Sequence, residues 1–136
     1  MKSLLFDFLK ILPDAEIFGI DISKYAIENS MKEVKQDLLV ANACKLPFPN
    51  NSFDVVISIN TIHNLDRNGC ISALKEINRV AKGNKSFVQV DSFHTPEQKQ
   101  IFESWVLTAY YHDYPENWIK LFEKAGYKGD YYWTII

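Results

Sequence analysis

The chain has 136 residues, 47% apolar and 24% charged, with 15 basic and 17 acidic side chains for a net charge of −2. This composition is typical of a globular chain with one core, so we expect a single domain over residues 1–136. The basic residues are scattered singly, which argues against a nucleic-acid partner. No apolar run approaches the ~20 residues of a membrane span. Two cysteines without CxxC spacing favour a reducing, cytoplasmic location.

Helical and strand-like periods alternate along the chain. Apolar spacing predicts helices over residues 3–12, 23–35, 68–82, 95–109 and 115–125. Short apolar runs predict strands over residues 17–22, 37–43, 53–60, 86–93 and 130–136. The run over 53–60 is apolar on both sides, so we expect it to be central. The alternation predicts an α/β fold, a Rossmann-like, doubly wound, mostly parallel sheet with helices on both faces.

Polar residues follow three of the predicted strands, where ligands bind in such sheets. They are Asp21, Asn42 with Ala43, and the segment 60–64. A carboxylate at Asp21 offers two acceptor oxygens, which suits the two hydroxyls of a ribose; the alternative is that Asp21 caps the helix that follows. The glycine turn of a dinucleotide site would lie ~20 residues before this acid, and none of the five glycines forms a GxG motif before a helix.

His63 follows the strand over 53–60. A neutral imidazole there could take a proton from an oxygen or nitrogen nucleophile, and the alternative is a histidine hydrogen-bonded in a loop. The chain has no GxSxG elbow and no metal-ligand spacing, so we expect neither a hydrolase nor a metal site. Aromatic residues gather after residue 100, where they cover one face of the sheet or, alternatively, line an acceptor pocket.

Three stretches carry a family resemblance: GIDIS (19–23), ANACKLPFPNNSFDVVISINTIHNL (41–65) and LKEINRVAKGNKSFVQVDSF (74–93). Together they resemble the class I S-adenosylmethionine-dependent methyltransferases, closest to the small-molecule type, from about residue 3 to the C-terminus. The resemblance implies methyl transfer to a small-molecule acceptor with S-adenosyl-L-methionine as the cofactor.

The resemblance also implies roles for individual residues. Asp21 would hold the ribose, and Ile22 would pack on the adenine. Asn42 and Ala43 would face the edge of the adenine, and Asn60 would lie beside the amino-acid end of the cofactor. His63 would stand where the acceptor approaches.

The first strand and glycine-rich turn of the family are absent from this sequence, which therefore resembles a truncated methyltransferase-like domain. We expect cofactor binding to be weak for this reason. We also expect a gap in the sheet between the strands over 17–22 and 53–60, with unpaired amides on both sides. The expected response is a homo-oligomer through this gap or an exposed edge, and direct closure of the two strands is the alternative. A second reading of the function is a non-catalytic α/β protein-interaction module derived from a methyltransferase.

Overall fold

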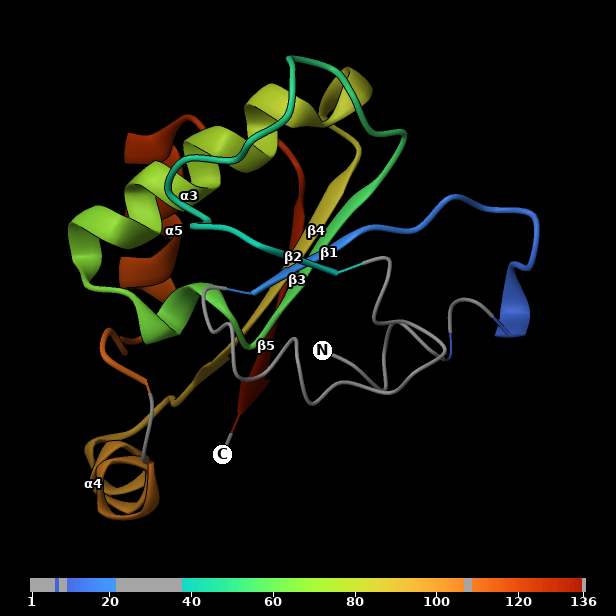
Figure 1. Cartoon of the computed structure of the whole chain (residues 1–136). Helices are drawn as coiled ribbons and strands as arrows, with labels where there is room; N and C mark the ends of the chain where they lie inside the picture. Colours follow the sequence, from blue (N-terminus) through green and yellow to red (C-terminus); the bar gives the residue numbers. More distant parts are fainter. Residues whose placement is uncertain (1–6, 8–9, 22–37, 107–108, 136) are drawn as a thin grey trace. The chain divides into compact units, whose positions relative to one another are not determined.

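The computed structural model describes residues 7, 10–21, 38–106 and 109–135 (Figure 1). Contacts divide the chain into two compact units, residues 1–47 and residues 48–136. The predicted helix over 23–35, most of the predicted helix over 3–12, and Ile22 lie outside the described residues. None of the helices in the described part is both long and apolar enough to cross a membrane.

The first unit contains two short parallel strands, β1 (Gly19–Asp21) and β2 (Leu38–Val40). Gly19 pairs with Leu38 and Asp21 pairs with Val40, so both strands end at the same edge of this two-stranded sheet. The predicted strands over 17–22 and 37–43 are confirmed, each with shorter bounds.

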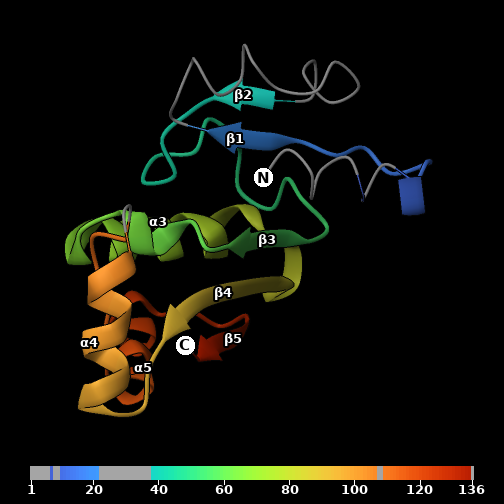
Figure 2. The same ribbon diagram turned by 90° about the horizontal axis from the view of Figure 1, so that it is seen from below.

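The second unit contains a three-stranded parallel sheet in the order β3 (Val56–Ile59), β4 (Ser86–Ser92) and β5 (Asp130–Ile135), as Figure 2 shows. Its helices are α3 (Arg67–Val80), α4 (Pro96–Trp105) and α5 (Pro115–Ala125). The predicted α/β fold with parallel strands is confirmed.

The central strand of the second unit is β4, and the prediction that residues 53–60 would be central is wrong within this sheet. β3 pairs only with β4 among the described strands, and Ile59 is 38% exposed. Phe53 lies before β3 and forms an isolated bridge with Ala81. The apolar character of β4 is less obvious in the sequence because serine and glutamine alternate with its valines.

The core of the second unit lies between the sheet and helices α3 and α5, which contact each other. Val88 and Val90 of β4 are fully buried. The side chains buried on the two helices are Cys70, Ile71, Ala73, Leu74, Ile77 and Val80 of α3 and Pro115, Trp118, Leu121, Phe122 and Ala125 of α5. Each large apolar side chain that leaves water in this way contributes roughly 1.5–3 kcal/mol to folding.

Short polar residues and prolines determine where these helices begin. Asp66 accepts a hydrogen bond from the backbone N–H of Gly69 at 2.7 Å and caps α3. Thr95 and Gln98 form a reciprocal capping box at the start of α4, and Pro115 opens α5. These starts agree with the predicted ones to within a residue.

The helix ends follow the sequence signals less closely. Gly126 ends α5 with a left-handed φ of 68°, as predicted. α3 ends at Val80, with Ala81 as its C-cap, and the left-handed Gly83 lies in the short 3-10 turn that follows. α4 ends at Trp105 instead of continuing to residue 109, and the amides of Tyr110 and Tyr111 donate to the carbonyl of His63.

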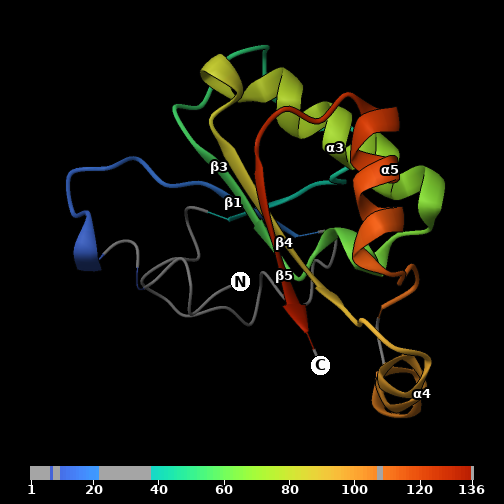
Figure 3. The ribbon, with the colours of Figure 1, turned by 180° about the vertical axis from the view of Figure 1, so that it is seen from behind.

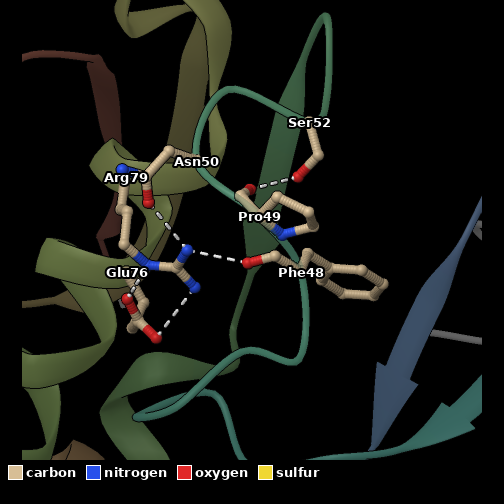
Figure 4. A network of polar contacts seen from close by, with 6 residues as sticks. All are labelled: Phe48, Pro49, Asn50, Ser52, Glu76 and Arg79. Atoms are coloured by element: carbon tan, nitrogen blue, oxygen red, sulfur yellow. Dashed lines mark hydrogen bonds and ion pairs between the residues drawn. The ribbon is translucent and has the colours of Figure 1, made fainter.

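The loop before β3 is tied to the end of α3 by Arg79 (Figure 4). The Arg79 guanidinium donates to the carbonyl of Phe48 at 2.7 Å and to Oδ1 of Asn50 at 3.0 Å, and it also binds the carboxylate of Glu76. In return, the amide of Asn51 donates to the carbonyl of Arg79 at 2.9 Å. The loop therefore satisfies backbone groups that the end of a helix leaves without an intrahelical partner.

Replacing Arg79 with methionine should lower the melting temperature, because the hydrogen bonds to Phe48, Asn50 and Glu76 are lost together. Lys82→Met is the matched control, since its ion pair with Asp54 at 3.1 Å is exposed and contributes little. Thermal denaturation followed by circular dichroism compares the two variants with the unmodified chain. Equal melting temperatures for both variants would contradict the anchoring role of Arg79.

Because Gly129 has no side chain, its backbone can lie close to Ser86 at the start of β4. A Cβ at residue 129 would lie 2.1 Å from Oγ and 2.8 Å from the carbonyl oxygen of Ser86. Gly129→Ala should therefore lower the free energy of unfolding by roughly 1–3 kcal/mol, as overpacking does. Urea denaturation checks this, with Lys128→Ala at the exposed neighbouring position as the control. An unchanged urea midpoint for Gly129→Ala would contradict this overpacking argument, because it would show that the chain at residue 129 can move away from Ser86.

Candidate functional site

The carboxyl end of β3 leads into a sharp turn at Asn60. Asn60 has a left-handed φ of 52°, which asparagine tolerates better than most residues, and its side chain is exposed. Its amide donates to the carbonyl of Gln89 at 2.9 Å, which ties the turn to β4. The chain then enters the 3-10 turn η2 (Ile62–Asn64), which leads to α3.

His63 lies in η2 and is 6% exposed. Its carbonyl accepts hydrogen bonds from the amides of Tyr110 at 2.8 Å and Tyr111 at 3.0 Å. The thiol of Cys70 donates to the carbonyl of Ile62 at 3.1 Å and fixes the same turn from the side of α3. His63 is therefore held through its backbone, while Nδ1 of its ring is buried without a hydrogen-bond partner in the described part of the chain.

The surroundings of His63 favour its neutral form. Burial lowers the pKa of His63 below its ordinary value, the carboxylate of Asp91 on β4 opposes this effect, and His112 adds to the lowering. At neutral pH the imidazole is therefore uncharged and able to accept a proton. The predicted role of His63 as a base requires this uncharged state.

Aromatic side chains surround His112, the second histidine of this region. Its ring centroid lies 5.4 Å from that of Phe102 and 6.2 Å from that of Phe93, and its Nε2 lies 3.2 Å from Glu103. Nδ1 of His112, like Nδ1 of His63, is buried without a hydrogen-bond partner among the described residues. The segment after α4 thus brings a second imidazole into the electrostatic environment of His63.

Tyr111 is a neighbour that does not serve as a base. Its hydroxyl donates to the carboxylate of Asp113 at 2.9 Å. Burial, together with this hydrogen bond, raises the pKa of Tyr111 to about 12, so the phenol stays protonated. Asp113 also accepts from the amide side chain of Asn117 at 2.7 Å, which fixes the segment to α5.

The other predicted site residues lie in the first unit. Asp21 is the last residue of β1 and pairs with Val40, the last residue of β2. Asn42 and Ala43 follow one residue after the end of β2, so the structure brings them to the same end of the sheet as Asp21. The side chain of Asp21 is not among the described ones. Oδ1 of Asn42 accepts from the amide of Cys44 at 2.8 Å and retains one lone pair for a further donor.

His63 was a predicted site residue, whereas Asp91 and His112 beside it were not. His63 follows β3 and Asp91 lies near the end of β4, the strand that pairs with β3, so this adjacency could have been predicted from the alternating pattern. The approach of His112 could not, because it depends on where α4 ends. No group of three or more histidine, cysteine, aspartate or glutamate side chains in the described ranges could hold a metal ion, and the sequence predicted no metal site.

Titration of the His63 ring by NMR should give a midpoint below 6.5, because burial disfavours the charged imidazole. Asp91→Asn should lower this midpoint further, and His112→Asn should raise it. The unfolded chain binds a proton more readily than the folded one, so His63 makes the fold less stable as the pH falls below 6.5. His63→Gln should therefore reduce the loss of stability in acid. A His63 midpoint at or above 6.5 would contradict the burial argument.

Known proteins are similar to this chain both in sequence and in fold. The model of the methyltransferase domain family matches residues 3–89. Demethylmenaquinone methyltransferase from Listeria welshimeri is 30% identical over 104 residues, a match that covers 71% of this chain and 43% of the relative. This chain therefore spans less than half the length of that relative.

Two solved structures share the fold. The YcgJ protein from Bacillus subtilis gives a TM-score of 0.69 at 18% identity, and the match covers 86% of this chain and 55% of that one. A chain from the complex between the Haloferax volcanii Trm112 methyltransferase activator and a methyltransferase gives a TM-score of 0.68 at 19% identity, over 92% of this chain and 56% of the other. At these identities the likeness establishes the fold.

Proposed function

This chain belongs to the methyltransferase domain family, as its resemblance to the class I S-adenosylmethionine-dependent methyltransferases predicted, and we propose that it serves methyl transfer from S-adenosyl-L-methionine to a small-molecule acceptor. One observation supports the proposal above the others. In each unit taken separately, the predicted site residues that the structure describes lie at or just beyond the carboxyl ends of parallel strands, where ligands bind in open α/β sheets.

The residues of the first unit fit the nucleoside part of this cofactor. Asp21, Asn42 and Ala43 share one end of the β1–β2 sheet, where a carboxylate can accept from ribose hydroxyls and an amide can meet the edge of a base. We assign the ribose to Asp21, the face of the adenine to Ile22, and its edge to Asn42 and Ala43. When bound, the cofactor supplies a methyl group on a positively charged sulfur that needs little further activation.

The residues of the second unit would contact the amino-acid end of the cofactor and the acceptor. Asn60, in its left-handed turn after β3, would bind the amino-acid end of the cofactor through its backbone. His63, neutral because it is buried, would take the proton from an acceptor oxygen or nitrogen. Alignment of the reactants with water excluded supplies most of the acceleration in such a transfer.

A ring-bearing acceptor suits this end of the sheet. The Listeria relative is named for demethylmenaquinone, a quinone. In this chain, Phe93 and Phe102 are buried against His112, and the half-exposed ring of Trp105 packs on Phe102, where an aromatic ring of an acceptor could pack in turn. The proposal of a ring-bearing acceptor rests on this aromatic cluster. We further propose that the chain self-associates.

Isothermal titration with S-adenosylhomocysteine tests the cofactor proposal. We expect weak binding for the 136 residues by themselves, since their sequence holds no glycine-rich turn to meet the methionine carboxylate. Asp21→Ala should weaken it about tenfold or more, because two charge-assisted hydrogen bonds to the ribose are lost. Asp14→Ala, the same change at an exposed turn residue of the first unit, should leave binding unchanged.

Each outcome of this titration is informative. Binding that Asp21→Ala and Asp14→Ala affect equally would contradict the assignment of the ribose to Asp21. No heat of binding at any concentration would contradict cofactor binding by this chain and would favour the non-catalytic interaction module.

A further inference from the structure

β5 is the outermost strand of the β3-β4-β5 sheet (Figure 3). Within the described part of the chain it pairs only with β4, so the backbone groups along its other edge have no strand partner. Natural edge strands are ordinarily protected from further pairing by charges, prolines, bulges or short length. From Tyr131 to Ile135 this strand carries no charge, no proline and no glycine, and it pairs without a bulge over six residues.

The side chains of β5 divide between the two faces of the sheet. The rings of Tyr131 and Trp133 lie 5.1 Å and 5.9 Å from the ring of Phe122 on α5, which fixes the strand against the core. Tyr132 and Thr134 alternate with them and lie on the opposite face, where Thr134 accepts from the side-chain amide of Gln89. β5 is therefore packed against the core through one face, while Tyr131, Tyr132 and Ile135 are 45%, 61% and 36% exposed.

We propose that β5 pairs antiparallel with β5 of a second copy, about a twofold axis at Trp133, to form one continuous six-stranded sheet. In this register Tyr131 lies opposite Ile135 of the second copy, and Tyr132 lies opposite Thr134. Aromatic and β-branched side chains stabilise such cross-strand pairs. The two Asp130 carboxylates lie at opposite ends of the paired segment, so that like charges stay apart.

The sequence of β5 favours a second copy over another occupant. A twofold pairing requires a strand that complements itself, and aromatic residues in the first half of DYYWTI face β-branched residues in the second half. The pairing also leaves neither copy with an unpaired β5 edge, so this contact cannot add a third copy. One short strand per copy buries less surface than a standard stable interface, so association should depend on protein concentration.

Sedimentation of paired charge variants tests both the surface and the register. Tyr132→Lys with Thr134→Lys places like charges opposite each other across the interface and should weaken the dimer about tenfold or more. Tyr132→Lys with Thr134→Glu places opposite charges there and should restore it. Both variants lose the hydrogen bond between Thr134 and Gln89. A difference between their dimer affinities therefore reports the contact between the two copies.

The unmodified chain should pass from monomer to dimer over about a hundredfold range of concentration. Ile101→Lys, at a 56% exposed position of α4, should behave like the unmodified chain. Circular dichroism checks that each variant is folded, and Tyr132→Lys alone replaces the double lysine variant if that one unfolds. A chain that stays monomeric throughout, growth beyond a dimer, or equal association of the two charge-pair variants would overturn the proposal.

Discussion

Parallel pairing of the strands is the constraint on which the rest of this molecule depends. Paired strands that run in the same direction end at the same edge of their sheet, so residues far apart in the sequence lie near one another there. In the first unit this brings Asp21 and Asn42 together. In the second unit it places Asn60 and His63, which follow β3, beside the end of β4 with Asp91.

Much of this arrangement could be predicted because it depends on local signals. The capping residues Asp66 and Thr95 begin their helices, and Gly126 ends α5, as single positions in the sequence indicate. Apolar runs likewise indicated five strands, all of which form within the described residues. The order of the strands was harder to predict, since β4 is central despite its serine and glutamine residues, whereas the more apolar β3 is less buried.

The environment of His63 could not be predicted because it depends on tertiary contacts. α4 ends at Trp105, the amides of Tyr110 and Tyr111 bind the carbonyl of His63, and His112 follows them within the electrostatic environment of His63. The tertiary contacts of the segment LPFPNNSFDVV, which carried the family resemblance, could not be predicted either. Its Asn50 and Asn51 bind Arg79 at the end of α3, so this part of the motif acts through the position of β3.

The central claim is that, in each unit, the residues that bind the ligand lie at the carboxyl ends of the parallel strands. The most direct measurement is an amide NMR titration with S-adenosylhomocysteine. The account predicts that shifts concentrate at the ends of β1, β2 and β3, including the amides of Ala43 and Asn60. Shifts that concentrate instead at the amino ends of the strands, around Lys85 and Ser86, would contradict it.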